Sequence, residues 1–221
     1  MTATGNPRHL ERPRRVHIVD AGLGNLRSVW HALAAVGAEP IVISEPQDLD
    51  GSARVILPGV GAFGDAMGSL RDGGWVSAIR RTVDENIPLL GICLGMQLLM
   101  TEGTEHGAHA GLDLVAGTVT QLRPGDPTLR LPHIGWNDIR PVRSCDLLAD
   151  IADHDFYFVH SFAVAPEDPG VITSYCEHGS DFVATLHSGS VYGAQFHPEK
   201  SHVSGLQLLR NFIEMDGEGE C

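Results

Sequence analysis

The sequence predicts an α/β protein with a mostly parallel sheet, helices on both of its faces and added antiparallel strands. Strand-like and helix-like segments alternate through the first half of the 221 residues, which is the pattern of a parallel sheet. The second half carries strand-like segments between turn residues and closes with one helical pattern. Because no linker separates the halves, we expect one domain with an extension.

The first half is read from short apolar runs and from helical spacing of apolar residues. The apolar runs predict four strands, at Val16–Asp20, Pro40–Ile43, Arg54–Leu57 and Leu89–Ile92. Helical spacing predicts helices at Leu26–Val36, once or twice within Phe63–Glu85, and from Leu94 to Met100.

The second half is richer in strand patterns. Five strands are expected, at Val115–Leu122, Phe156–Val164, Val171–Tyr175, Phe182–His187 and Val191–Phe196. The last segment, His202–Met215, has apolar residues at helical spacing and predicts a closing helix.

The two ends of the chain differ from the middle in composition and are not expected to belong to the folded domain. Residues 1–15 are Arg-rich, lack the apolar stretch of a signal peptide and are expected to be a disordered tail. Residues 216–221 are acidic and Gly-containing and are expected to fray, which leaves 16–215 as the folded domain. No run approaches about 20 apolar residues, so we expect no membrane span and a cytoplasmic location.

Net charge and residue spacing indicate which partners and cofactors are not expected. A formal net charge of −13 repels phosphate backbones, so nucleic acid is not an expected partner. His106 and His109 are three residues apart, but Gly107 weakens a helix there and we expect no metal site. The Gly22-x-Gly24 pair lacks the third glycine of a dinucleotide loop, so no cofactor is expected.

The strongest local signal is a cysteine between two glycines. Cys93 follows an apolar strand, precedes an apolar helix, and has Gly91 and Gly95 two residues to either side. This is the cysteine form of the G-x-S-x-G nucleophile elbow, whose sharp turn requires small neighbours. The helix N-terminus behind the thiol favours thiolate and oxyanion charge. Cys93 is therefore the candidate nucleophile, although most isolated cysteines are merely buried apolar residues.

A thiol nucleophile needs a base, and the base needs an acid to orient it. His197 and Glu199 flank Pro198 at the end of a predicted strand. Residues two apart in an extended segment face the same way, and Pro198 favours an extended conformation at His197. The pair is the candidate base and orienter; taken without Cys93 it would read as a solvated surface turn.

Glycines after the third strand offer backbone donors for an oxyanion. Val60 lies between Gly59 and Gly61, and two glycines allow the backbone to turn its N–H groups into a pocket. An ordinary turn is the alternative for this segment.

Together these segments resemble the class I (triad) glutamine amidotransferases, and within them the glutaminase subunits of imidazole glycerol phosphate synthase. The resemblance covers about Val16 to Met215, with its blocks in the expected order. As a set the blocks are highly specific: Gly22–Ser28, Leu57–Phe63, Gly91–Gln97, Leu131–Asn137, Phe158–Ser161 and Phe196–Ser201.

The resemblance implies a role for each matching residue. Cys93 would attack the side-chain amide of glutamine and hold a glutamyl thioester, His197 would shuttle protons and Glu199 would orient His197. The backbone N–H groups of Val60 and Leu94 would form the oxyanion hole. The residues that would grip glutamine are Gly61, Gln97, Glu105, Ser161 and Phe162. Those that would face a partner are Asn25, Trp136, expected in a loop, and Lys200.

The resemblance also implies a partner. Members of this branch pair as heterodimers with a (β/α)₈-barrel cyclase, which receives the ammonia and uses it on a ribonucleotide substrate. The chain would thus be the ammonia source, with L-glutamine as its own substrate.

Other readings stay open from the sequence. One is the glutaminase of a related triad enzyme, such as anthranilate or aminodeoxychorismate synthase, although Met96 stands where those elbows usually carry His. Others are a non-catalytic partner module and a free-standing cysteine hydrolase. Two departures from the family pattern, Ala21 in place of an aromatic residue and Phe162 in place of tyrosine, affect contacts and remove no catalytic group.

Overall fold

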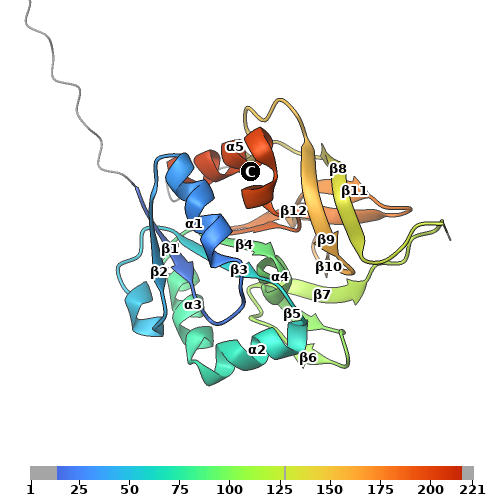
Figure 1. Ribbon diagram of the computed structural model, residues 1–221. Coiled ribbons are helices and arrows are strands. Elements are labelled where there is room, and N and C mark those ends of the chain that lie inside the picture. Colours follow the sequence, from blue (N-terminus) through green and yellow to red (C-terminus); the bar gives the residue numbers. More distant parts are fainter. Residues whose placement is uncertain (1–13, 127, 216–221) are drawn as a thin grey trace, which may run out of the picture.

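The computed structural model describes residues 14–126 and 128–215 (Figure 1). The expected tails therefore fall outside the described residues, except at Arg14 and Arg15. Here the expectation is wrong, because strand β1 (Arg15–Val19) begins at Arg15 and the guanidinium of Arg14 donates to the carbonyl of Ile213, 2.7 Å away. An arginine-rich composition indicated a tail, but pairing with a neighbouring strand orders Arg15.

Within residues 14–126 and 128–215, nine strands form the larger sheet, in the order β2-β1-β3-β4-β13-β12-β11-β8-β9. The first five run parallel: β2 (Glu39–Ile43), β1, β3 (Val55–Gly59), β4 (Leu89–Cys93) and β13 (Val191–Ala194). The remaining four are antiparallel to their neighbours: β12 (Asp181–Ser188), β11 (Ile172–Glu177), β8 (His133–Pro141) and β9 (Asp155–His160). The predicted parallel sheet with an antiparallel extension is confirmed.

Helices cover both faces of the parallel strands, as Figure 1 shows. Helices α1 (Leu26–Ala35) and α5 (His202–Glu214) pack on one face, where Leu33 and Phe212 join a core with Ile18 and Ile56. The other face is covered by α2 (Phe63–Asp72), α3 (Trp75–Asp84) and α4 (Leu94–Leu98). Short 3₁₀ turns lie at η1 (Pro46–Leu49), η2 (Asp146–Leu148), η3 (Pro169–Val171) and η4 (Pro198–Lys200).

A second sheet of four strands, again within the described ranges, has the order β10-β7-β5-β6. Its strands are β10 (Phe162–Pro166), β7 (Val115–Gln121), β5 (Met100–Gly103) and β6 (His109–Ala110). The strand predicted at Phe156–Val164 is in fact two: β9 lies in the larger sheet, β10 lies in the smaller, and the chain passes between them at Ser161.

Two further differences concern local structure. The helix after Cys93 ends at Leu98, because Met100 pairs with Val115 as the start of β5. Trp136 is not in a loop but in β8, a strand that the sequence reading missed. Within the described ranges, no helix is long and apolar enough to cross a membrane.

Candidate active site

Cys93 occupies the junction of β4 and α4, at the carboxyl edge of the parallel strands. Its backbone is at φ 54° and ψ −111°, a conformation that residues with a Cβ seldom adopt. The side chain is 6 % exposed and its Sγ lies 4.0 Å from the carbonyl oxygen of Val159. The strained turn that the elbow motif predicts is present.

The two glycines beside Cys93 are required by close packing of α4 on the sheet. A Cβ on Gly95 would lie 1.8 Å from the carbonyl oxygen of Leu57 in β3. A Cβ on Gly91 would lie 2.7 Å from both Gly95 O and Met96 N. Neither position has room for a side chain, because backbone atoms cannot give way as a flexible side chain does.

His197 and Glu199 meet beside the thiol, as their spacing predicts. His197 follows β13, Glu199 lies in η4, and Nδ1 of the histidine is 2.7 Å from Oε1 of the glutamate. Both side chains are almost wholly buried, with exposures of 1 % and 0 %. The carboxylate fixes Nδ1 as the protonated nitrogen, so Nε2 is directed away from Glu199.

The protonation of His197 is set by opposing effects. Burial acts to lower its pKa, but hydrogen bonding and charge at Cys93 and Glu199 outweigh burial and raise the pKa to about 10. Apart from the interaction with Cys93 that raises this pKa, Nε2 of His197 makes no hydrogen bond among the described residues, and neither does Oε2 of Glu199, although both atoms are buried. A buried, proton-bearing imidazole whose second nitrogen interacts with the nucleophile is suited to proton transfer.

Asn25 makes a contact that the amino-acid sequence did not predict. Its side-chain amide donates to Oε1 of Glu199, the same oxygen that His197 contacts. Asn25 is half-buried, adopts φ 61° and precedes α1. This residue, expected only at a partner surface, therefore also holds the carboxylate of the candidate triad.

A cavity of about 290 Å³ opens in front of the thiol. Every residue that the resemblance assigned to glutamine lines it, together with Cys93 and His197; the full lining is Val60, Gly61, Cys93, Leu94, Gln97, Glu105, Pro132, Val159, His160, Ser161, Phe162 and His197. Pro132, Val159 and His160 were not singled out from the sequence. The volume is suited to a ligand as small as an amino acid.

Two polar residues of the cavity wall are held by the fold. Glu105 accepts a hydrogen bond from the N–H of Phe63 at the start of α2, 2.8 Å away. Gln97 donates from Nε2 to the carbonyl of Phe162 at 2.9 Å and to Oε1 of Gln195 at 3.1 Å. Gln195 is fully buried and was missed, although it stands two residues before His197 in the sequence.

The two backbone N–H groups expected at the oxyanion hole differ in whether they already donate a hydrogen bond. Leu94 opens α4, so its N–H has no acceptor within the helix. The N–H of Val60 instead donates to the carbonyl of Leu23, 2.9 Å away. In this conformation Val60 does not direct its N–H at an oxyanion.

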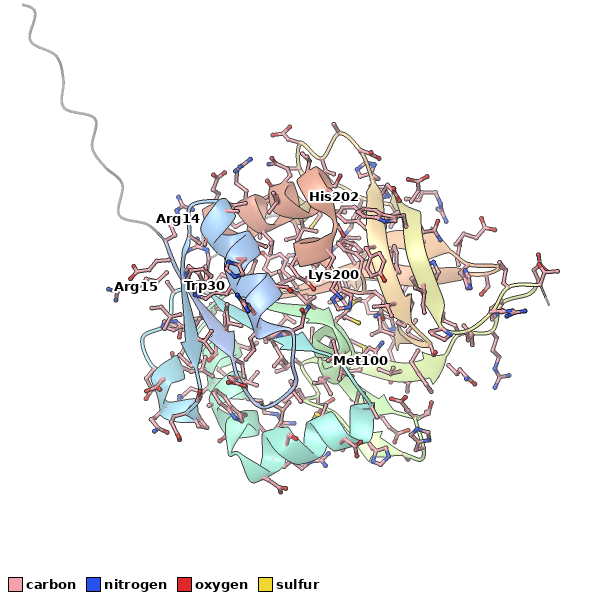
Figure 2. All side chains as sticks on the ribbon, viewed as in Figure 1. Arg14, Arg15, Trp30, Met100, Lys200 and His202 are labelled. Atoms are coloured by element: carbon pink, nitrogen blue, oxygen red, sulfur yellow. The ribbon has the colours of Figure 1, made fainter. Side chains whose placement is uncertain are left out.

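The other two residues expected at a partner surface lie together beyond the cavity. Trp136, 44 % exposed, stacks on His202 with ring centroids 4.8 Å apart. The Nζ of Lys200 lies 5.7 Å from the centroid of the Tyr157 ring. Figure 2 shows Lys200 and His202 between α5 and β9, away from Arg14 and Arg15 at the other end of the sheet.

In the part of the chain that the structure describes, no group of three or more His, Cys, Asp or Glu side chains is arranged to hold a metal ion.

The chain is similar to curated proteins along most of its length. It is 45 % identical over 203 residues to the imidazole glycerol phosphate synthase subunit HisH of Moorella thermoacetica, covering 91 % of this chain and 95 % of that protein. With the HisH subunit of Aquifex aeolicus it shares 46 % identity over 200 residues, covering 90 % and 95 %.

Solved structures share the fold at lower identity. A glutamine amidotransferase crystal structure superposes with a TM-score of 0.71 at 21 % identity, covering 90 % of this chain and 97 % of the other. The structure of PurLQS from Thermotoga maritima gives a TM-score of 0.71 at 19 % identity, covering 91 % and 98 %. The family model for glutamine amidotransferase class-I matches residues 17–215. The chain therefore belongs to the class I glutamine amidotransferase family.

Proposed function

We propose that this chain is the glutaminase subunit of imidazole glycerol phosphate synthase, which hydrolyses glutamine and passes ammonia to a cyclase subunit in histidine biosynthesis. The observation that carries the proposal is the buried Cys93–His197–Glu199 constellation at the mouth of an amino-acid-sized cavity. It is supported by identities of 41–46 % to HisH subunits over about nine-tenths of the chain. A cytoplasmic location accords with such a biosynthetic role.

The first half of the reaction forms a thioester. In the proposed mechanism His197 carries the proton of the thiol, and the Cys93 sulfur attacks the side-chain amide carbon of glutamine. The C–N bond then breaks, the proton on Nε2 of His197 goes to the departing nitrogen, and ammonia leaves. His197 holds its proton through neutral pH because its pKa is raised to about 10, so it begins the cycle as the acid.

The second half releases glutamate. Neutral His197 takes a proton from water, the hydroxide oxygen attacks the thioester carbon, and the C–S bond breaks to return the thiolate. Glu199 holds the imidazole in one tautomer throughout and stabilises its charged form. Asn25 holds Glu199 in turn.

Glutamine is positioned by the cavity wall in this proposal. Glu105 supplies a carboxylate for the α-ammonium group, while Gly61, Ser161 and Phe162 supply backbone and side-chain contacts around the amino-acid end. Gln97 lies one turn after Cys93 on the same helix face and completes the wall.

The partner in this proposal is a (β/α)₈-barrel cyclase that forms a heterodimer with the chain. Trp136, Lys200 and the outer side of Asn25 would contact it. The proximity of Trp136 to Lys200 through their neighbours His202 and Tyr157 supports a shared surface.

The test is glutamate release from glutamine by the chain alone, by the chain with the cyclase subunit, and by the pair with the cyclase nucleotide. We expect release to rise strongly with the loaded partner and to vanish in Cys93→Ser. Cys176→Ser is the matched control, because Cys176 is also a buried free cysteine but lies in β11 and does not line the cavity. Release stimulated only by a chorismate-using partner would overturn the pathway assignment and keep the chemistry.

A further inference from the structure

Gln195 connects the nucleophile to the cavity wall. It follows β13, has no exposed surface, and its backbone N–H donates to the carbonyl of Ala184, 2.8 Å away. Its side chain contacts two residues: Oε1 lies 3.1 Å from Nε2 of Gln97, and Nε2 lies 3.8 Å from Sγ of Cys93. Burying an amide is costly unless its groups are hydrogen-bonded, and both of these contacts satisfy that need.

The direction of these bonds follows from a backbone carbonyl. The oxygen of Phe162 is only an acceptor, so the atom of Gln97 that faces it at 2.9 Å must be the NH₂ group. The second hydrogen of that group then meets Gln195, which must present its oxygen. The NH₂ of Gln195 is thereby left facing the sulfur. An amide flip at Gln195 would set two NH₂ groups against each other.

A second chain of hydrogen bonds ends on the same carbonyl and holds it in place. The Nδ1 of His160 lies 2.9 Å from the oxygen of Phe162, which again can only accept. The Nε2 of His160 is then free to accept from Nδ1 of His133, 3.4 Å away. The carbonyl that orients both glutamine side chains is thus itself fixed from two sides.

We infer that Gln195 is a further catalytic residue, whose side-chain NH₂ donates to the Cys93 sulfur and stabilises it as the attacking thiolate and as the group that leaves the thioester. The sulfur carries negative charge at these two points and little when it is bonded to carbon or hydrogen. A donor aimed at it therefore favours the charged form. The inference deepens the proposed glutaminase function and rests on it.

The other groups around the sulfur have different roles, so the donor that stabilises the thiolate is Gln195. On one side His197 carries the proton and is paired with Glu199. On another, the carbonyl of Val159, at 4.0 Å, accepts from a thiol but repels a thiolate. Gln195 does not line the cavity, so it reaches the sulfur from behind and makes no contact with the space for substrate.

Two substitutions separate donation to sulfur from support of Gln97. Gln195→Met keeps the approximate volume and removes both contacts. Gln195→Glu keeps the shape and an oxygen that accepts from Gln97, but replaces the donor at the sulfur with an acceptor. The control is Thr185→Val, which removes a buried hydroxyl on the neighbouring strand, where Thr185 pairs with Ala194 and bonds to Thr173 and Ser174.

The primary readout is the rate at which iodoacetamide alkylates Cys93 in the chain alone, followed by mass spectrometry of the Cys93 peptide at several pH values. We expect Gln195→Met to slow alkylation at pH 7 about tenfold and to move the pH profile toward higher pH. Gln195→Glu should slow it at least as much, and Thr185→Val should leave it within about twofold. Thermal unfolding of each variant confirms that the folded protein is compared.

Glutamate release with the nucleotide-loaded cyclase gives the second readout. We expect kcat to fall about tenfold or more in both Gln195 variants. KM should stay within about twofold in Gln195→Glu, because its oxygen still accepts from Gln97 and Gln195 itself is outside the substrate space. Wild-type alkylation and wild-type turnover in Gln195→Glu, with losses only in Gln195→Met, would overturn the inference and leave Gln195 as support for Gln97. Slowing by Thr185→Val equal to that of Gln195→Met would also overturn it.

The alkylation experiment does not depend on glutamine. If the wild-type chain released no glutamate with any partner, the proposed function would fail, while the effect of Gln195 on the thiol would still be measured.

Discussion

The side-chain amide of Asn25 donates a hydrogen bond to the carboxylate of Glu199, joining the loop before α1 to the third member of the candidate triad. These residues are 174 positions apart in the sequence. The contact leaves Glu199 held from two sides, by an imidazole and by an amide.

Asn25→Ala should reduce kcat for glutaminase about tenfold, because a hydrogen bond to a charged group is typically worth about 1.5–3 kcal/mol and each 1.4 kcal/mol is a factor of about ten. Glutamate release with the loaded cyclase partner is the measurement. Asn86→Ala is the matched control: Asn86 also has positive φ, 57° against 61°, but lies at the end of α3. An equal loss in the two variants would show that only backbone strain matters.

The triad itself should act as a unit. Cys93→Ser and His197→Ala should each lower kcat by about 10³-fold or more, and the double variant should be no worse than the poorer single variant. Glu199→Gln should lose less, because an amide still contacts Nδ1 while the charge is lost. Single-turnover and steady-state assays of glutamate release measure this; additive losses in the double variant would contradict it.

The oxyanion hole should be completed only when the partner is loaded. Since the N–H of Val60 donates to Leu23 in this structure, the peptide before Val60 must reorient to meet an oxyanion, and the flanking glycines permit this. Val60→Ala keeps the N–H and should keep stimulation by the partner. Val60→Pro removes the N–H and should lower stimulated turnover about 10²-fold. Equal wild-type turnover with and without the loaded partner would refute the reorientation.

Acid stability should depend on the buried histidines beside the cavity. Burial, with the charge of His178 adding to it, lowers the pKa of His133 to about 4. Burial is also the main cause that lowers the pKa of His160 to about 3, against the opposing bond to the carbonyl of Phe162. The unfolded chain binds these protons near pH 6.5, so stability is complete above that pH and is lost as the pH falls toward 4 and then 3.

Thermal unfolding midpoints between pH 7 and 4 test this. The wild-type midpoint should fall more steeply than that of His133→Gln, which has no proton to take up. His31→Gln, at an exposed position on α1, is the control and should follow the wild-type slope. A parallel fall in all three proteins would assign the acid sensitivity to other groups.

Several features of the site were predictable because they depend on local geometry. The glycines around Cys93 predicted a sharp strand-to-helix turn, and the structure has one. His197 and Glu199 meet as expected, although the chain between them is the start of the 3₁₀ turn η4 and not an extended segment. The main sheet followed from the alternation of strands and helices.

The features that were missed depend on contacts between distant segments. Nothing within Phe156–Val164 shows that the chain changes sheets at Ser161, because that follows from which strands lie alongside. Trp136 read as a loop residue because Gly135 and Asn137 flank it, yet β9 pairs with that whole segment. Gln195 and Asn25 acquire their roles from partners about 100 and 174 residues away.

The bond between Arg14 and the carbonyl of Ile213 has a practical meaning for protein engineering. It brings the start of β1 and the end of α5 together at the amino edge of the parallel strands, whereas Cys93 ends β4 at the carboxyl edge. A short peptide could therefore bridge these two points, and a circularly permuted gene could open the chain at a different surface loop. Fluorophores or affinity handles attached near Arg14 would likewise sit a full strand length from the chemistry.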